Sequence, residues 1–367
     1  MQLCGSPQQQ HRSKDRSHDG DNYGIPCTWE CPVAVTPVSG NARVSPLFTR
    51  RWGFVRKNAS IFLIYGLIIL IAGIASIYSD TFRTASNVAN ILRQSIILGL
   101  IAIGQSMVVL TGGMDISIDM IARTVAVVVA TLFATFESDS TLIVPLLFLG
   151  TAIGVALGGV NGVLITRTHA NPFIITFGMA SILRGVNLAI ATTPIRGIPS
   201  PYLRIYDAKI GIVAINVIVM GFIWFAVWLF STRTRLGRSL FAIGGSERVA
   251  QLSAIRVNRT LVSAYVLSGF FAALAGLFVL ARMGVGDPST AEGMTFQSIV
   301  AVAVGGISLY GGKGSLIGTL GGVLLLSMLS NVFNLMQVNI YYQQLLLGLV
   351  VLIAVAAYRS TRSARPG

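Results

Sequence analysis

Long apolar runs follow one another from residue 58 almost to the end of the chain, separated by short polar stretches. A transmembrane helix needs about 20 mostly apolar residues, and most of these runs meet that length. We therefore predict an all-α, polytopic membrane fold of about ten transmembrane helices. The predicted spans cover residues 59–78, 92–111, 117–135, 142–165, 172–192, 211–231, 260–282, 295–311, 315–336 and 340–358. The run 295–311 is short and interrupted by glycine, which favours a broken or re-entrant helix.

The chain divides into a transmembrane domain at 58–359 and two polar ends. Residues 1–57 have too few apolar side chains for a core, so they are predicted to form a disordered cytoplasmic tail. Residues 360–367 form a short basic tail on the same side. The first tail contains three cysteines and two histidines whose spacing matches no common zinc site: Cys4, Cys27, Cys31, His11 and His18. Reduced thiols are therefore the simpler interpretation of the cysteines.

Composition and charge agree with a membrane protein. Of 367 residues, 53% are hydrophobic and 11% are charged, and the mean hydropathy is +0.74. The net charge of +14 is not gathered into a patch with interleaved aromatic residues, which argues against nucleic-acid binding. Lys and Arg instead lie at the ends of apolar runs and in alternate loops, where they contact lipid headgroups and set topology. By the positive-inside rule, both termini and the basic loop 232–259 are cytoplasmic.

The loop 232–259 has a predicted structure of its own. Gly244 and Gly245 are expected to break the chain, and Ser246 is a suitable N-cap for a short amphipathic helix over Glu247–Ala254. Glu247 suits the positive end of such a helix. A compact helix presented to the cytosol predicts a docking surface for a partner protein.

Several polar residues fall inside the predicted spans. Asp115, Asp119 and Arg123 are four residues apart, so they project from one side of a helix that begins after Gly112-Gly113. An Asp119–Arg123 ion pair would lower the cost of burying both charges, whereas a carboxylate beside an unwound glycine pair could bind a polar solute. Arg184 has no acid near it in sequence and needs a distant partner or water.

Asn161, Thr176 and Asn331 are uncharged, and each could hydrogen-bond hydroxyl groups or bridge two helices. Glycines recur every four residues at 154, 158 and 162 and at 314, 318 and 322, which permits close helix contacts for sliding or for static packing. Residues 153–165 also resemble residues 317–329, and the glycine pair at 112–113 resembles that at 305–306. These similarities suggest an internal repeat of the kind that transporters contain.

Motifs for catalysis and for cofactors are missing from the sequence. The glycine-rich stretch around Lys313 lacks the residues of a phosphate-binding loop at Ile307 and Gly314. No nucleophile–base arrangement or metal cluster can be identified, so a membrane enzyme is disfavoured. We expect no cofactor and no metal, and any energy must come from a partner or an ion gradient.

Four segments, 104–119, 161–185, 236–257 and 301–322, resemble the permease subunits of bacterial ABC importers for monosaccharides, the ribose, xylose and galactose group. The resemblance runs in order from about residue 56 to 358. It implies a ten-helix inner-membrane permease that pairs with a second permease copy, identical or different. It also implies a cytoplasmic ABC ATPase, which uses the ATP, and a periplasmic substrate-binding protein.

The resemblance also implies roles for particular residues. The family's ATPase-coupling segment falls on 237–257 and includes Gly244, Gly245, Glu247, Ala250, Leu252 and Ser253. We expect the substrate pathway to be lined by six residues near a central cavity, where an aromatic face suits a sugar ring and polar groups suit its hydroxyls: Asp115, Ser117, Asn161, Phe173, Thr176 and Asn331.

Other functions remain open at this level. Related permeases carry branched-chain amino acids or a furanose signalling molecule. An ion-coupled secondary transporter would work without an ATPase, and Asp115 and Asp119 keep that hypothesis open. The helix expected after Gly245 favours the ABC importer, because a solitary carrier needs no docking helix.

Overall fold

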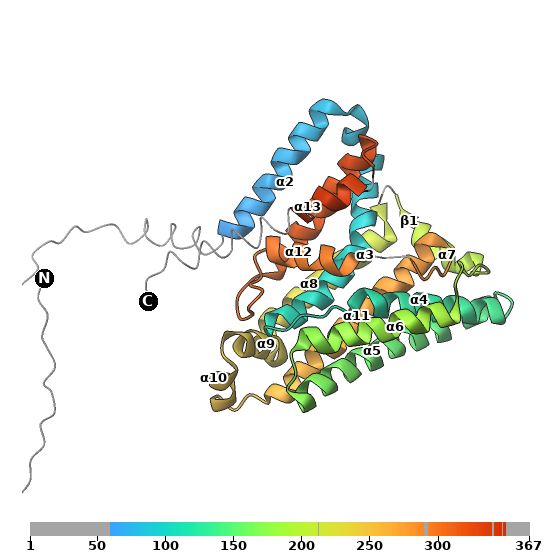
Figure 1. Ribbon diagram of the computed structural model, residues 1–367. Coiled ribbons are helices and arrows are strands. Elements are labelled where there is room, and N and C mark those ends of the chain that lie inside the picture. Colours follow the sequence, from blue (N-terminus) through green and yellow to red (C-terminus); the bar gives the residue numbers. More distant parts are fainter. Residues whose placement is uncertain (1–58, 212, 290–292, 340, 347, 350–367) are drawn as a thin grey trace, which may run out of the picture. The chain divides into compact units, whose positions relative to one another are not determined.

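The computed structural model describes residues 59–211, 213–289, 293–339, 341–346 and 348–349, all within the unit Arg50–Gly367 (Figure 1). The two predicted tails, 1–57 and 360–367, lie outside the described residues. The elements, in chain order, are α2 (Ala59–Tyr78), the 3-10 helix η1 (Asp80–Arg83), α3 (Ala85–Leu110), α4 (Ile118–Thr135), the 3-10 helix η2 (Ser140–Leu142), α5 (Ile143–Thr168), α6 (Pro172–Ile190), α7 (Ser200–Asp207), β1 (Lys209–Ile210), β2 (Val213–Ala214), α8 (Ile215–Arg233), α9 (Arg235–Gly245), α10 (Glu247–Leu252), α11 (Val257–Met283), α12 (Met294–Val304) and α13 (Leu316–Leu335). The two short strands pair antiparallel, with Lys209 opposite Ala214.

The predicted all-α, polytopic membrane fold is confirmed. Within the described part of the chain, eight helices are long and apolar enough to cross a membrane: α2, α3, α4, α5, α6, α8, α11 and α13. The predicted span 295–311 contains only α12, whose 11 residues reach about 16 Å, roughly half of the hydrocarbon core. The chain is helical again at 341–346 and 348–349, where the last predicted span begins, and the rest of that span lies outside the described residues.

Local sequence signals set several helix ends. Thr84 caps α3 by accepting a hydrogen bond from the Asn87 backbone N–H at 3.2 Å. Asn171 caps α6 in the same way, and Pro172 occupies the first turn, where its missing N–H costs nothing. Gly284 ends α11 in the left-handed conformation, with φ of 66°.

The helices include two units with the same order of elements. In one unit α3 is followed by a non-helical break and then by α4 and α5; in the other α11 is followed by a break and then by α12 and α13. The long first helix of each unit packs on the other unit, since α11 contacts α4 and α5 while α3 contacts α12 and α13. Figure 1 shows α4, α5, α6 and α11 lying side by side. The packing of the first helix of each unit on the other unit agrees with the predicted internal repeat.

The core is centred on α3. Every residue from Ser95 to Leu110 is buried. A helix that is apolar on all sides is expected to be surrounded by other helices, and α3 is. The glycine row of α5 allows equally close contact with α11: a Cβ on Gly158 would overlap the backbone oxygen of Tyr265. The second predicted row is partly wrong, because Gly314 lies in the loop before α13, and Gly318 and Gly322 contact α12.

Candidate functional site

The break between α3 and α4 carries a buried carboxylate. Gly112, with φ of 84°, turns the chain away from α3, and Asp115 follows at 0% exposure. Its carboxylate accepts hydrogen bonds from the Ser117 backbone N–H at 2.9 Å and from the Ser117 hydroxyl at 2.7 Å. The Ser268 hydroxyl of α11 donates to the second carboxylate oxygen at 2.8 Å. These donors compensate the carboxylate for its lost hydration.

Two further predicted residues join this network. The Asn161 amide of α5 donates to the Ser117 hydroxyl at 2.8 Å. The Thr176 hydroxyl of α6 accepts from the Ile116 backbone N–H at 3.1 Å. The structure therefore brings together four of the six expected pathway residues: Asp115, Ser117, Asn161 and Thr176. Ser268 was missed, because a serine in an ordinary apolar helix gives no sequence signal.

The other two expected pathway residues lie elsewhere, which corrects the expectation of a single shared site. Phe173 is 48% exposed and stacks on Phe177 of the same helix, with ring centroids 6.2 Å apart. Asn331 of α13 exchanges amide hydrogen bonds with Asn87 of α3, at 3.0 and 2.9 Å. A reciprocal amide pair bridges two helices and leaves the Asn331 side chain buried, so its position favours the helix-bridging alternative.

The predicted ion pair between Asp119 and Arg123 is confirmed. The guanidinium Nη2 of Arg123 lies 3.5 Å from the carboxylate Oδ2 of Asp119, and both side chains are buried. Each residue also touches the second broken region: Arg123 Nη1 donates to the Pro288 backbone oxygen at 3.1 Å, and Thr295 accepts from the Asp119 backbone N–H at 3.4 Å. The pair therefore joins α4 to the segment between α11 and α12.

A small polar pocket lies beside this pair. It has a volume of about 80 Å³. Its wall is formed by α4, α6 and the turn at 288–289 after α11, and the lining residues are Met120, Arg123, Arg184, Asn187, Leu188, Pro288 and Ser289. Arg184, expected to need a distant partner or water, lines this pocket together with Arg123. We call these seven residues the polar pocket.

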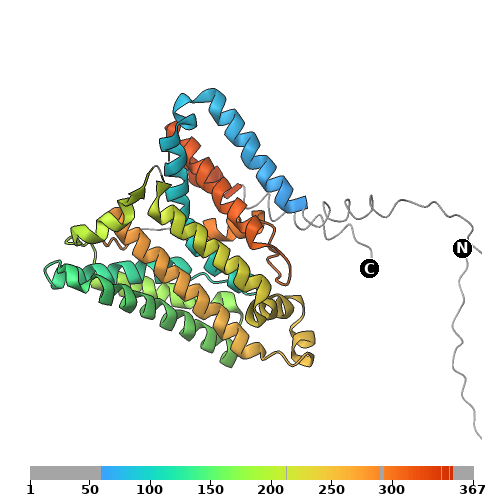
Figure 2. The same ribbon diagram turned by 180° about the vertical axis from the view of Figure 1, so that it is seen from behind.

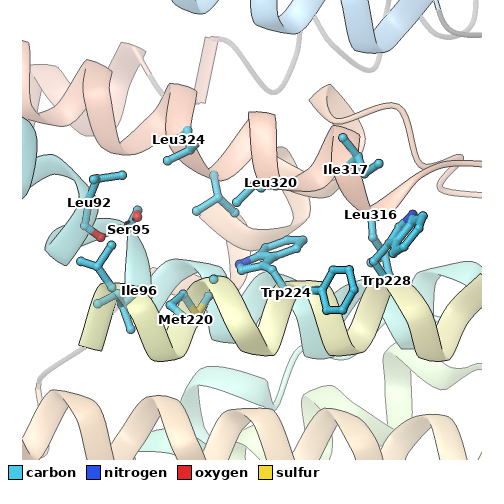
Figure 3. Close-up of a pocket in the computed structure, with 14 residues that line it drawn as sticks. Leu92, Ser95, Ile96, Met220, Trp224, Trp228, Leu316, Ile317, Leu320 and Leu324 are labelled. Atoms are coloured by element: carbon cyan, nitrogen blue, oxygen red, sulfur yellow. Dashed lines mark hydrogen bonds between the residues drawn. The ribbon is translucent and has the colours of Figure 1, made fainter. Parts of the chain in front are cut away.

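A larger groove is almost entirely apolar. It has a volume of about 500 Å³ and lies between α3, α8 and α13 (Figure 3). Trp224 and Trp228 extend from α8 toward α13, and Ser95, the polar residue on its wall, donates its hydroxyl to the Leu92 backbone oxygen at 2.7 Å. None of the expected pathway residues lines it. Its surface suits hydrocarbon and offers little to a polar solute.

The loop between α8 and α11 contains two helices, where one was predicted. Residues Arg235–Gly245 form α9, so the glycine pair ends a helix instead of breaking an irregular chain. Ser246 caps α10 by accepting from the Val249 backbone N–H at 3.4 Å, as expected. The second helix ends at Leu252, before the predicted end at Ala254, whose φ of 59° is not helical. Figure 2 shows both short helices at the ends of α8 and α11.

Exposure separates the residues of α10 into two faces. Leu252 is 83% exposed, and Glu247, Val249 and Ser253 are exposed beside it. Ala250 is 2% exposed and packs with the cluster of Ile243 and Val257. The expectation that Ala250 lies on the docking surface is therefore corrected, because the chain's own packing already covers it.

Gly244 and Gly245 also differ. Gly244 is pressed against the backbone of Gly311, Gly312 and Leu110, where a Cβ would overlap. Gly245 faces open space and has no left-handed backbone angle, so the expected need for glycine in a turn is wrong at this position. The sequence shows the glycine pairs 244–245 and 311–312, but it gives no signal that the backbones of Gly244 and Gly312 are in contact.

In the part of the chain that the structure describes, no cluster of His, Cys, Asp or Glu could hold a metal ion. Among the polar groups inside the spans are two clusters: the polar pocket and the Asp115 network, which consists of Asp115, Ser117, Asn161, Thr176 and Ser268. They offer hydrogen bonds and paired charges to a solute.

Comparison with known proteins identifies the family. Residues 87–355 match the model of the branched-chain amino acid transport system / permease component family. The chain is 38% identical over 296 residues to the ribose import permease protein RbsC of Bacillus subtilis, covering 79% of this chain and 89% of that protein. It is 34% identical to RbsC of Haemophilus influenzae, covering 79% and 90%. It is 31% identical to the D-allose transport system permease protein AlsC of Escherichia coli, covering 80% and 89%.

No solved structure matches the chain. The family model spans both units, both broken regions and the loop with α9 and α10. The chain therefore belongs to this family of transport-system permease components, and it is a multi-pass membrane protein.

Proposed function

We propose that this protein is the permease subunit of an ATP-binding-cassette importer and forms the path of a monosaccharide across the inner membrane of a bacterium. The observation that carries the proposal is its similarity, over about four fifths of its length, to permeases named for ribose and allose import. Galactose and fructose import permeases are also about 30% identical.

The Asp115 network supports a role in the path. Carboxylate, hydroxyl and amide groups from a helix break, α5, α6 and α11 meet inside the spans, where buried polar groups are costly. In this conformation they hydrogen-bond one another. Opening of the break would release the same groups to the hydroxyls of a sugar, so the network would alternate between protein and solute partners.

Coupling is proposed to act through α9 and α10. The exposed Leu252 and Val249 of α10 would enter a groove of a cytoplasmic ABC ATPase, which binds and hydrolyses the ATP. This permease would need no cofactor of its own. It would pair with a second permease copy and receive the sugar from a periplasmic binding protein, with both of its termini cytoplasmic.

Reconstitution tests this proposal. The protein is purified from its own host with any ATPase that accompanies it, placed in proteoliposomes with the periplasmic binding protein, and given labelled D-ribose, D-allose, D-galactose or D-fructose. We expect one of these sugars to accumulate only with ATP. Accumulation of none of them, or purification without an ATPase, would contradict the proposal.

The same vesicles separate the alternatives. Uptake driven by a proton or sodium gradient without ATP would indicate a secondary transporter. ATP-dependent uptake of L-leucine but of no sugar would favour a branched-chain amino acid permease, which the description of the family model also fits. A furanose signalling molecule would be recognised by competition against the labelled sugar.

A further inference from the structure

The polar pocket contains groups that the fold leaves without partners. Asn187 of α6 is 2% exposed, and neither its amide nitrogen nor its amide oxygen is hydrogen-bonded within the described residues. The Arg123 Nε is also buried and unpaired there. Arg184 lines the same pocket, and no acidic side chain of the described part lies within ion-pair distance of it.

Unpaired buried groups of this kind are expensive. Each costs about 1–3 kcal/mol, and folded proteins leave few of them. A leucine at position 187 would fill similar space without that cost. The chain instead keeps an amide, with two donor hydrogens and one acceptor oxygen, beside two guanidinium groups. Hydroxyl groups both donate and accept, so a polyhydroxylated molecule satisfies this set.

The charges around the pocket balance. Arg123 and Arg184 supply two positive charges, Asp119 pairs with Arg123, and Asp287 lines the adjoining hollow on the other side of Arg123. Among the described residues around the pocket, two positive and two negative groups give no net attraction for an anion. The pocket therefore favours a neutral ligand that is bound by hydrogen bonds.

The position of the pocket suits a solute in transit. Arg184 lies 12 residues after Pro172, about 18 Å along α6 from its N-terminal end. Pro288 and Ser289 belong to the turn between α11 and α12. A volume of about 80 Å³ holds one or two hydroxyl groups at the edge of a sugar, with the ring outside.

We propose that Arg184, Asn187 and Arg123 form a subsite that hydrogen-bonds the hydroxyls of a neutral sugar on its way toward the Asp115 network. This inference rests on the proposed function and adds to it where the sugar is held and by which groups. Asn187 acts by direct contact with the solute. Arg184 orients it from the exposed side.

The first test uses Asn187→Leu, with Ser181→Ala on an exposed position of the same helix as the control. Loss of an unpaired amide should maintain or raise the melting temperature, whereas uptake of the transported sugar should fall at least tenfold. If the Asn187 amide has only a structural role, uptake by Asn187→Leu should be unchanged. Arg184→Gln carries the test if the leucine variant does not fold, because Arg184 is exposed and its loss leaves no cavity.

A second measurement detects occupancy directly. Ser289 lines the pocket and is exposed, so a Ser289→Cys variant with Cys4, Cys27 and Cys31 replaced by serine can be labelled with a water-soluble maleimide. The transported sugar should slow labelling at this position severalfold, and Asn187→Leu should abolish the protection. Ser200→Cys, outside the pocket, should label at the same rate with and without sugar.

The outcomes distinguish the two proposals. If the unmodified protein imports no sugar, the proposed function fails and this inference falls with it. If it imports a sugar while Asn187→Leu and Arg184→Gln both transport like Ser181→Ala and the sugar does not protect position 289, the function stands and the subsite is refuted.

Discussion

The backbones of Gly244 and Gly312 are in direct contact. A Cβ on Gly244 would overlap the backbone nitrogen of Gly312 and the backbone oxygen of Leu110. The Gly312 N–H donates to that Leu110 oxygen at 3.0 Å, so the end of α3, the loop after α12 and α9 meet at one point. The end of α9, directly before α10, is therefore in backbone contact with the region next to the break after α3.

Two adjacent alanine substitutions test this junction. Gly244→Ala should separate α9 from the loop after α12, because the added Cβ would overlap backbone atoms, which cannot move away by a side-chain rotation. Gly245→Ala meets open space in a helical conformation and should be neutral or stabilising by about 0.5–1 kcal/mol. We expect ATP-dependent uptake to fall at least tenfold in Gly244→Ala and to change less than twofold in Gly245→Ala. Equal effects would contradict the contact.

The two faces of α10 give a second contrast. Leu252→Glu places a charge on the exposed face, so the protein should keep its melting temperature and lose the ATPase on affinity purification. Ala250→Glu buries an unpaired charge beside Ile243 and Val257, at about 3 kcal/mol or more, so its melting temperature should fall. Retention of the ATPase by the Leu252 variant would show that α10 is not the dock.

The Asp115 network predicts unequal effects at one position. Asp115→Ala leaves the Ser117 backbone N–H and two hydroxyls without an acceptor and should destabilise by about 2–3 kcal/mol in thermal unfolding. Asp115→Asn keeps an acceptor oxygen, and the two serine hydroxyls can rotate. Its loss of stability in thermal unfolding should therefore be smaller than that of Asp115→Ala. Uptake by the asparagine variant then reports on the charge alone. Unchanged transport would remove the carboxylate from the pathway.

The Asn87–Asn331 pair is suited to a double-mutant cycle. Asn87→Leu leaves the buried Asn331 amide without this partner, at about 1–3 kcal/mol. Asn331→Leu should cost less, because the Asn87 amide nitrogen also donates to the Phe82 backbone oxygen at 3.3 Å. The double change replaces both partners by apolar groups and should be more stable than the sum of the single changes predicts. Additive losses would mean that the two amides are not coupled. Normal uptake by the double variant would place Asn331 outside the path.

The sequence determined the membrane fold and the parts that depend on local physics. Runs of apolar residues must be helical in a bilayer, so the spans described by the structure were predictable from hydropathy. The interruption of the predicted span 295–311 was predictable too, and the structure has a short helix at Met294–Val304 there. The cap at Ser246 and the ion pair between Asp119 and Arg123 also follow from spacing within one helix. Each of these features depends on residues only a few positions apart.

Tertiary structure alone decided which distant residues meet. Ser268 joins Asp115 across 153 positions, Asn331 pairs with Asn87 across 244, and Gly244 touches Gly312. Periodicity in a single helix shows which residues share a face but not which face of another helix covers it. For that reason Ala250 could be placed on the correct helix from sequence, while its burial depended on the packing of α9 and α11 around it.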